Sequence, residues 1–113
     1  MLEQTTPLAY DGIMEFQWDL QKNQANIEKH GLSFEEASEI FKMPENLVLE
    51  EYDFEHSLAE DRIISIGPIA RGIIIVVSVE RDDGNIIRLI SARFASTAEQ
   101  KRYTEVIAGM NDE

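Results

Sequence analysis

Apolar and polar positions follow two different periods along the chain, and the changes of period mark the predicted elements. Apolar residues recur every three or four positions in some segments, which is typical of amphipathic helices. In other segments they alternate or run together, which is typical of strands. In chain order we predict a strand at 16–18, helices at 20–30 and 33–43, strands at 47–52, 62–67, 73–80 and 86–94, and a last helix after Ser96.

Residues suited to helix ends set the boundaries of the first two helices. Asp19 can accept hydrogen bonds from the free N–H groups of the first turn, and Gly31 can take the left-handed conformation that ends a helix. Ser33 and Glu36 have the spacing of a capping box, so the second helix is predicted to begin there. Pro44 is predicted to end it, because proline has no N–H to donate.

The second half of the chain predicts a sheet followed by a helix. Residues 73–77 are apolar on both faces, as in a central strand, whereas the polar segment 53–61 predicts a loop. A second capping box, at Ser96 and Glu99, precedes the last helix. The predicted buried stripe of that helix consists of Tyr103, Val106, Ile107 and Met110. The pattern therefore predicts an α+β fold, with helices against an antiparallel sheet of about four strands.

The composition is that of one ordinary globular domain with a strong acidic excess. The chain has 113 residues, 43% of them hydrophobic, and a net charge of −12. The absence of cysteine excludes disulfides and cysteine nucleophiles and suits a reducing cytoplasm, and the longest apolar run is too short to cross a membrane. Because this net charge repels polyanions, a nucleic-acid site would need the few basic residues to converge on one patch.

The first residues are not part of the recognisable pattern. Residues 1–15 contain no lysine or arginine, so we expect no signal peptide. We expect 1–13 to be a disordered N-terminal extension, or to arise from a start site placed too far upstream, and 14–110 to be a single domain.

Four short motifs occur in a fixed order. The first is Trp18-Asp19-x-x-Lys22-x-x-x-Asn26-x-x-Lys29-His30-Gly31-x-Ser33-Phe34-Glu35-Glu36-Ala37. The others are His56-Ser57-x-x-Glu60-x-Arg62, then Ile87-Arg88-Leu89-Ile90-Ser91-Ala92-Arg93, then Glu99-x-x-Arg102-Tyr103. Together they resemble the BrnT-type toxins of bacterial type II toxin–antitoxin systems, over about residues 14–108.

The resemblance implies a fold, an activity and a partner. The fold would be RelE-like, with two N-terminal helices and one C-terminal helix on an antiparallel sheet. The activity would be that of a metal-independent endoribonuclease without a cofactor, which inhibits translation by cutting RNA in the cytoplasm. The partner would be a BrnA-like antitoxin, in a heterotetramer that neutralises the toxin and contacts operator DNA only through the antitoxin.

RNA cleavage by transesterification needs a base for the 2′-hydroxyl, cations for the anionic phosphorane and an acid for the leaving oxygen. Arg88 is the best candidate from the residues themselves, because an arginine in so apolar a strand must either pair with a carboxylate or open into a cleft. Arg93 is an odd number of residues away, so a regular strand points it to the other face. Both serve one site only if the strand bulges near Ser91 and Ala92 or Arg93 lies at its frayed end.

Three further candidates have equally plausible structural roles. Lys22 is either a solvated lysine balanced by nearby acids or, as the resemblance implies, a phosphate contact. Arg62 is either an edge arginine in a surface ion pair or a cation at the rim of the site. His56 is either an exposed loop histidine or a general acid or base, since histidine is a common proton-transfer residue.

The acidic excess also supports an alternative function. The acidic pairs at 35–36 and 50–51 have no recognised metal-ligand spacing, so we predict no metal site. A non-enzymatic binding module of the same fold, acting only as antitoxin partner and corepressor, would be less affected by repulsion of RNA. Arginines each paired with a glutamate would favour this module, and a cluster of free cations would favour the ribonuclease.

Overall fold

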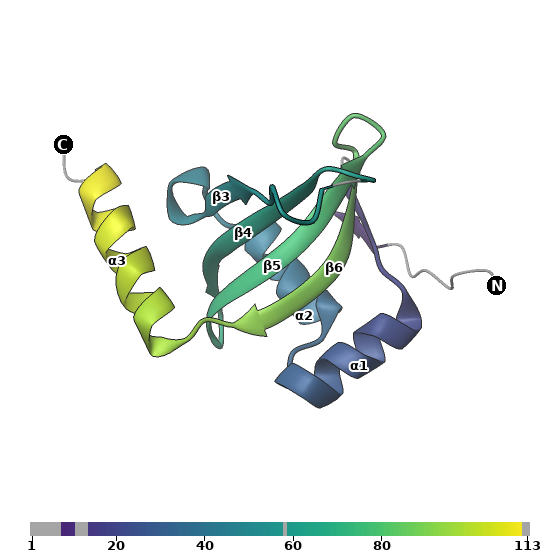
Figure 1. The fold of residues 1–113 in the computed structure, drawn as a ribbon, viewed down its shortest axis with the longest axis horizontal. Helices are drawn as coiled ribbons and strands as arrows, with labels where there is room; N and C mark the ends of the chain where they lie inside the picture. The colour runs from purple at the N-terminus through teal and green to yellow at the C-terminus, as the bar shows by residue number, and fades with distance from the viewer. Residues whose placement is uncertain (1–7, 11–13, 58, 112–113) are drawn as a thin grey trace.

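The computed structural model describes residues 8–10, 14–57 and 59–111, and these form one mixed sheet with helices around it (Figure 1). The strands are β1 (Leu8–Tyr10), β2 (Met14–Gln17), β3 (Leu49–Tyr52), β4 (Arg62–Ile69), β5 (Gly72–Arg81) and β6 (Ile86–Phe94). The helices are α1 (Leu20–His30), α2 (Phe34–Ala37) and α3 (Thr97–Asn111), with 3₁₀ segments η1 (Ser38–Lys42) and η2 (Glu45–Leu47).

The predicted α+β class is confirmed, but the sheet has more strands than predicted and one of its pairings is parallel. The described residues form six strands in the order β1-β2-β6-β5-β4-β3, and β2 pairs with β6 in parallel. The hydrophobic pattern identifies a strand but not its neighbours, and β2 meets β6 only after two helices and the β3–β5 meander. β1 lies within the segment expected to be disordered, and the remainder of that segment, 1–7 and 11–13, lies outside the described residues.

Helix α1 begins and ends as predicted, but the second helix is shorter than expected. The Asp19 carboxylate accepts from the N–H groups of Gln21 and Lys22, and Gly31 has φ +68°. The second helix is α-helical only over Phe34–Ala37 and continues as 3₁₀ turns. The Ser38 hydroxyl donates to the Glu35 carbonyl at 2.6 Å, and such side-chain bonding to the backbone competes with the α-helical ladder.

The C-terminal helix α3 forms as predicted, but half of its predicted apolar stripe is exposed. Tyr103 is buried and its hydroxyl donates to the Leu47 carbonyl, whereas Val106 and Met110 are 36% and 57% exposed. Figure 1 shows why: α3 (yellow) stands at the end of the sheet and does not cover it. No helix among the described residues is long and apolar enough to cross a membrane.

The core lies between the sheet and the α2–η1 segment. Its centre consists of fully buried side chains, among them Phe34, Ile40, Ile74 and Leu89. Helix α1 flanks the later half of β6, which β2 does not pair with, and there the Asn26 side chain donates to the Ala92 carbonyl at 2.8 Å and accepts from the Ala92 N–H at 3.2 Å. The opposite face of the sheet, which we call the outer face, carries the candidate arginines.

Candidate functional site

A β-bulge decides which arginines share a face. Val77 pairs with Ser91 and Ser78 pairs with Leu89, so Ile90 is an extra residue in β6. The extra residue reverses the alternation of side chains, and Arg88 and Arg93 therefore both point to the outer face. The bulged residue, Ile90, directly precedes Ser91 and Ala92, near which the sequence required a bulge.

The strand register adds Arg62 to the same face. Arg62 pairs with Val79, and Val79 pairs with Arg88, so the two arginines occupy one cross-strand row on either side of a valine. Neighbouring strands lie about 4.8 Å apart, which places the Cα atoms of Arg62 and Arg88 roughly 10 Å from each other. Arg93 pairs with Ile75, four residues along β5 from Val79, and so lies farther away.

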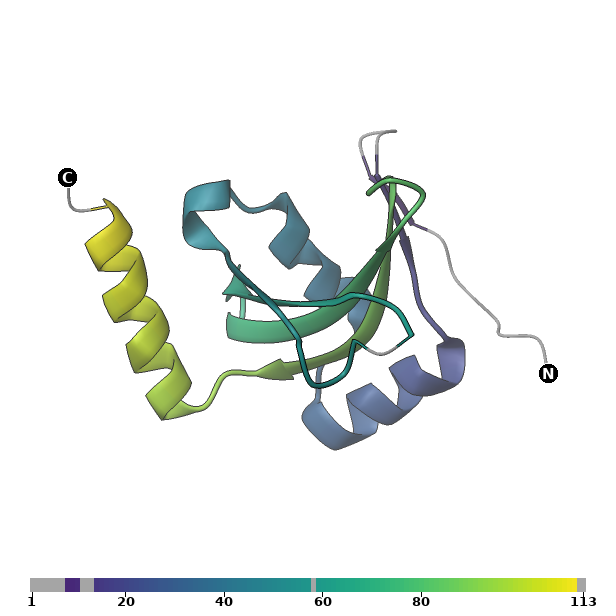
Figure 2. The same ribbon diagram turned by 45° about the horizontal axis from the view of Figure 1, so that its top comes forward.

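Arg88 is buried beneath the surface of this face. Its side chain is only 4% exposed, and its neighbour Val79 is 3% exposed. The loop between β3 and β4 (teal in Figure 2) crosses in front of the strands, while the α2–η1 segment lies behind them. Of the two alternatives that the sequence allowed for Arg88, this burial therefore disfavours the one in which it opens into a cleft.

Arg62 is half-buried and is held through its backbone by the β3–β4 loop. Its carbonyl accepts from the Asp53 N–H at 2.9 Å, and its N–H donates to the Ser57 hydroxyl at 2.9 Å. The Ser57 hydroxyl in turn donates to the Asp53 carbonyl at 2.6 Å. Among the described residues the Arg62 side chain has no hydrogen bond or ion pair, so its guanidinium can bind an anion.

The same loop orients His56. The His56 Nδ1 lies 3.1 Å from Asp53 Oδ2, and the His56 N–H donates to Asp53 Oδ1 at 3.3 Å. The His56 side chain is 61% exposed. A carboxylate on Nδ1 fixes the orientation of the ring and leaves Nε2 toward solvent, where it can exchange a proton with a bound molecule.

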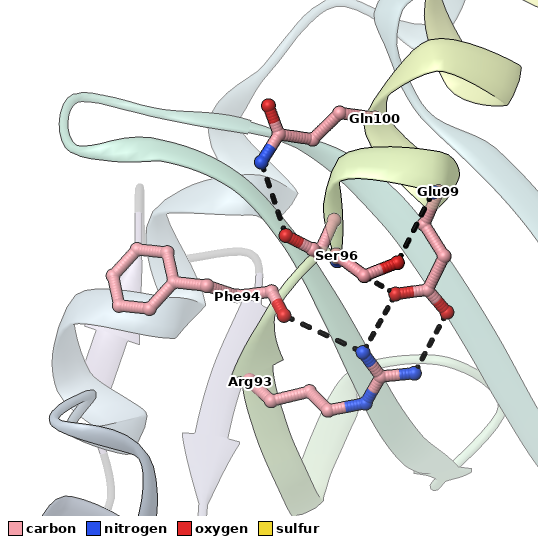
Figure 3. Close-up of polar contacts among 6 residues, drawn as sticks. Arg93, Phe94, Ser96, Glu99 and Gln100 are labelled. Carbon is pink, nitrogen blue, oxygen red and sulfur yellow. Dashed lines mark hydrogen bonds and ion pairs between the residues drawn. The ribbon is translucent and has the colours of Figure 1, made fainter.

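Arg93 is committed to a carboxylate of α3. Its Nη1 and Nη2 donate to the two Glu99 oxygens at 2.8 and 2.9 Å (Figure 3). Glu99 also completes the predicted capping box, accepting from the Ser96 N–H at 2.8 Å while its own N–H donates to the Ser96 hydroxyl. The Arg93 guanidinium, with the Ser96 N–H, lowers the pKa of Glu99 to about 2. This bidentate pair ties α3 to the end of β6, so Arg93 has a structural role here.

The other basic residues are distributed over several surfaces. Lys22 is exposed on α1, and no contact among the described residues joins it to the outer-face arginines. Arg71 pairs with Glu36 at 2.6 Å and Arg81 with Glu60 at 3.1 Å. The Arg71 guanidinium lowers the pKa of Glu36. At least three of the six arginines are thus paired with a glutamate in the described part of the chain.

The role of Asp53 in this site was not predicted. The Asp53–His56 spacing of three residues is a visible signal, but the contact depends on a loop conformation that the polar pattern does not specify. The hydrogen bonds of the buried Asn26 to the Ala92 backbone of β6 were not predicted either. In the described ranges no group of three or more histidine, aspartate or glutamate side chains is placed to hold a metal ion.

Comparison with protein families gives one match. A model described as the ribonuclease toxin BrnT of type II toxin–antitoxin systems matches residues 18–99, which is well over half of the chain. These residues include β3–β6, the loop with Asp53 and His56, and both partners of the Arg93–Glu99 pair. No curated protein matches the chain.

Proposed function

The chain belongs to the BrnT family of ribonuclease toxins of type II toxin–antitoxin systems, and from this premise we propose where and how it acts on RNA. Family membership implies a ribonuclease toxin with an antitoxin protein as its partner. We propose that RNA binds the outer face of the sheet where the β3–β4 loop joins β4. The supporting observation is that one loop both orients His56 through Asp53 and holds the backbone of Arg62, whose guanidinium can bind an anion.

In the proposed reaction the 2′-hydroxyl of RNA attacks the adjacent phosphorus. The P–O5′ bond breaks, and the products are a 2′,3′-cyclic phosphate and a 5′-hydroxyl. Arg62 binds the phosphate oxygens, where its planar guanidinium matches two of them. Arg88 lies buried in the same cross-strand row and supports this surface from within the sheet. His56 Nε2 takes up the proton of the 2′-hydroxyl or protonates the leaving 5′-oxygen, and solvent water carries out the other transfer. Lys22 would contact the RNA strand beyond this centre, and Arg93 would only hold α3.

Several finer features of the function belong to the same proposal. The reaction is metal-independent, because arginine supplies the positive charge and histidine the proton transfer. Cleavage of RNA inhibits translation, and the fold is RelE-like. A BrnA-like, DNA-binding antitoxin neutralises the toxin in a heterotetramer and connects it to operator DNA. The acidic excess suits a basic partner, which it attracts. It is compatible with RNA binding if only the outer face attracts RNA.

The proposal is tested with purified protein and 5′-labelled RNA, in the presence and absence of EDTA. We expect cleavage in both conditions and cyclic-phosphate ends. Replacing Arg62 or His56 by alanine should slow cleavage by about 100-fold, the usual effect of losing a charge-stabilising or proton-transferring group. The matched control is Arg102→Ala, an exposed cation on α3, which should cleave like the wild type. Wild-type rates in both site variants would contradict the assignment.

A second function is favoured by the ion pairs. Arg71, Arg81 and Arg93 are bound to glutamates and Arg88 is buried, so exposed positive charge on the outer face is sparse. These observations support a binding module that serves only as antitoxin partner and corepressor. Induced expression in a bacterial host separates the two functions. Growth arrest with RNA cleavage, lost in Arg62→Ala, supports the ribonuclease, and normal growth with abundant wild-type protein supports the binding module.

A further inference from the structure

A groove of about 350 Å³ lies on the helical face of the sheet, opposite the proposed RNA site. Its floor is formed by the buried Ile40, Ser78 and Ile87. Partly buried side chains from β2, from η1 and the segment between it and β3, and from β4 form the walls. The walls consist of Met14, Phe41, Met43, Val48 and Ile63. The groove is large enough for a few apolar side chains, near the lower end of the range for ligand sites.

The rim of the groove is acidic. Three glutamates, Glu45 of η2, Glu50 of β3 and Glu80 of β5, are exposed and line the groove, and its lining contains no lysine or arginine. Like charges around a low-dielectric floor repel one another and attract cations. An occupant that brings apolar groups to the floor and positive charges to the rim would therefore bind favourably.

The separation of the rim glutamates indicates the size of the occupant. Glu50 pairs with Ser65, which pairs with Val76, and Glu80 lies four residues along β5 from Val76. Standard sheet spacings then place Glu50 and Glu80 roughly 16 Å apart between Cα atoms. A single metal ion cannot bridge this distance, but about five residues of extended peptide span it.

We propose that this groove binds a basic amphipathic peptide segment of a partner protein, with apolar side chains on the floor and lysine or arginine at the rim. Only the identification of that partner as the antitoxin rests on the function proposed above. The binding of a basic amphipathic peptide by the groove does not depend on that function. The segment binds on the helical face, and Arg62 lies on the outer face. The part of the partner that is bound in the groove therefore does not cover Arg62.

The test uses a short fluorescein-labelled peptide that alternates leucine and lysine, and a counterpart with glutamate in place of lysine. Binding is measured by fluorescence anisotropy at physiological salt, where remote surface charges are screened within about 8 Å. The groove variant carries Glu45→Gln, Glu50→Gln and Glu80→Gln. The matched control variant, Glu28→Gln, Asp83→Asn and Glu105→Gln, removes the same amount of charge from residues that do not line the groove.

We expect the leucine–lysine peptide to bind the wild type and the glutamate counterpart not to bind. The groove variant should bind about ten-fold more weakly, since each exposed ion pair contributes modestly, and the control variant should stay within about two-fold. Equal weakening in both variants would show attraction by net charge alone and would overturn the proposal. Absence of peptide binding would also overturn it. So would a wild-type dimer that the groove variant converts to a monomer, because the occupant of the groove would then be a second copy of this chain.

RNA cleavage by the same proteins separates this proposal from the proposed function. The groove variant should cleave RNA at the wild-type rate, because its substitutions lie on the opposite face from Arg62. If the wild type binds the peptide but cleaves no RNA, the proposed function fails and the groove proposal stands. If the wild type cleaves RNA but the groove and control variants bind the peptide equally, the groove proposal fails and the proposed function stands.

Discussion

The ion pair between Arg93 and Glu99 should make the stability of the protein depend on pH in a defined way. The perturbation is Glu99→Gln, which preserves the shape of the side chain and its position at α3 but removes the charge. Two oxygens of Glu99 accept from Arg93 at 2.8 and 2.9 Å, and the carboxyl pKa falls from 4.5 to about 2. A shift of that size corresponds to roughly 3 kcal/mol of stability.

This figure is an upper bound, because solvent screens the pair. The Arg93 and Glu99 side chains are 43% and 37% exposed, and exposed ion pairs contribute up to about 1 kcal/mol. The bidentate geometry and the additional Ser96 N–H bond raise the expected loss to about 1–1.5 kcal/mol at neutral pH. The folded-state pKa is depressed, so this stability is present above pH 4.5 and is lost as the pH falls toward 2.

The assay is urea unfolding followed by Trp18 fluorescence, repeated between pH 7 and pH 2, with hydrogen exchange of the α3 amides as a local measure. The free-energy difference between wild type and Glu99→Gln should be constant near neutrality and vanish near pH 2. Glu105→Gln, on the same helix, is the control and should change stability little at any pH. A difference that persists at pH 2 would refute an electrostatic origin and assign the loss to packing or capping.

Three further substitutions test the fold. Asn26→Ala should destabilise by about 2–3 kcal/mol in urea unfolding, because the backbone groups of Ala92 would be left buried without their partner. Gly67→Ala should destabilise by about 1–3 kcal/mol in the same assay, since its new Cβ would lie 3.2 Å from the Leu47 carbonyl oxygen. Gly109→Ala, with nothing within 4 Å of the new Cβ, should stabilise α3 by about 0.5–1 kcal/mol in thermal unfolding.

The parts of the fold that depend on local hydrogen bonding could be predicted from the sequence. Asp19 and Gly31 delimit α1 because both act on backbone groups of their own helix, and the strand from 86 to 94 was predicted with its observed bounds. The parallel pairing of β2 with β6 could not be predicted, since nothing in four residues of β2 identifies a neighbour about seventy residues later in the chain. The exposure of α3 was missed for a similar reason: an apolar stripe does not specify what covers it.

The site depended on two features that no residue pattern encodes. Arg88 and Arg93 share a face only because Ile90 is bulged, and the sequence could state that condition without showing that it is met. The burial of Arg88 could not be predicted, because the apolar pattern of its strand does not specify what covers the outer face. His56 could be singled out by its chemistry, but Asp53 becomes its partner only once the loop is closed by hydrogen bonds to Arg62.

The sheet separates the acidic groove from the outer-face cations, and β3 lies next to both. Glu50 of β3 is at the groove rim, and two residues later Tyr52 begins the contacts of the β3–β4 loop: its ring stacks edge-on against Phe54 and its hydroxyl donates to Asp61 at 2.8 Å. The β3 strand is at the edge of the sheet, so a partner in the groove can reach past it to this loop without crossing the sheet. In the proposed arrangement a net charge of −12 does not conflict with RNA binding. The acids on the helical face would attract a basic partner, while Arg62 on the outer face would bind RNA over a short range.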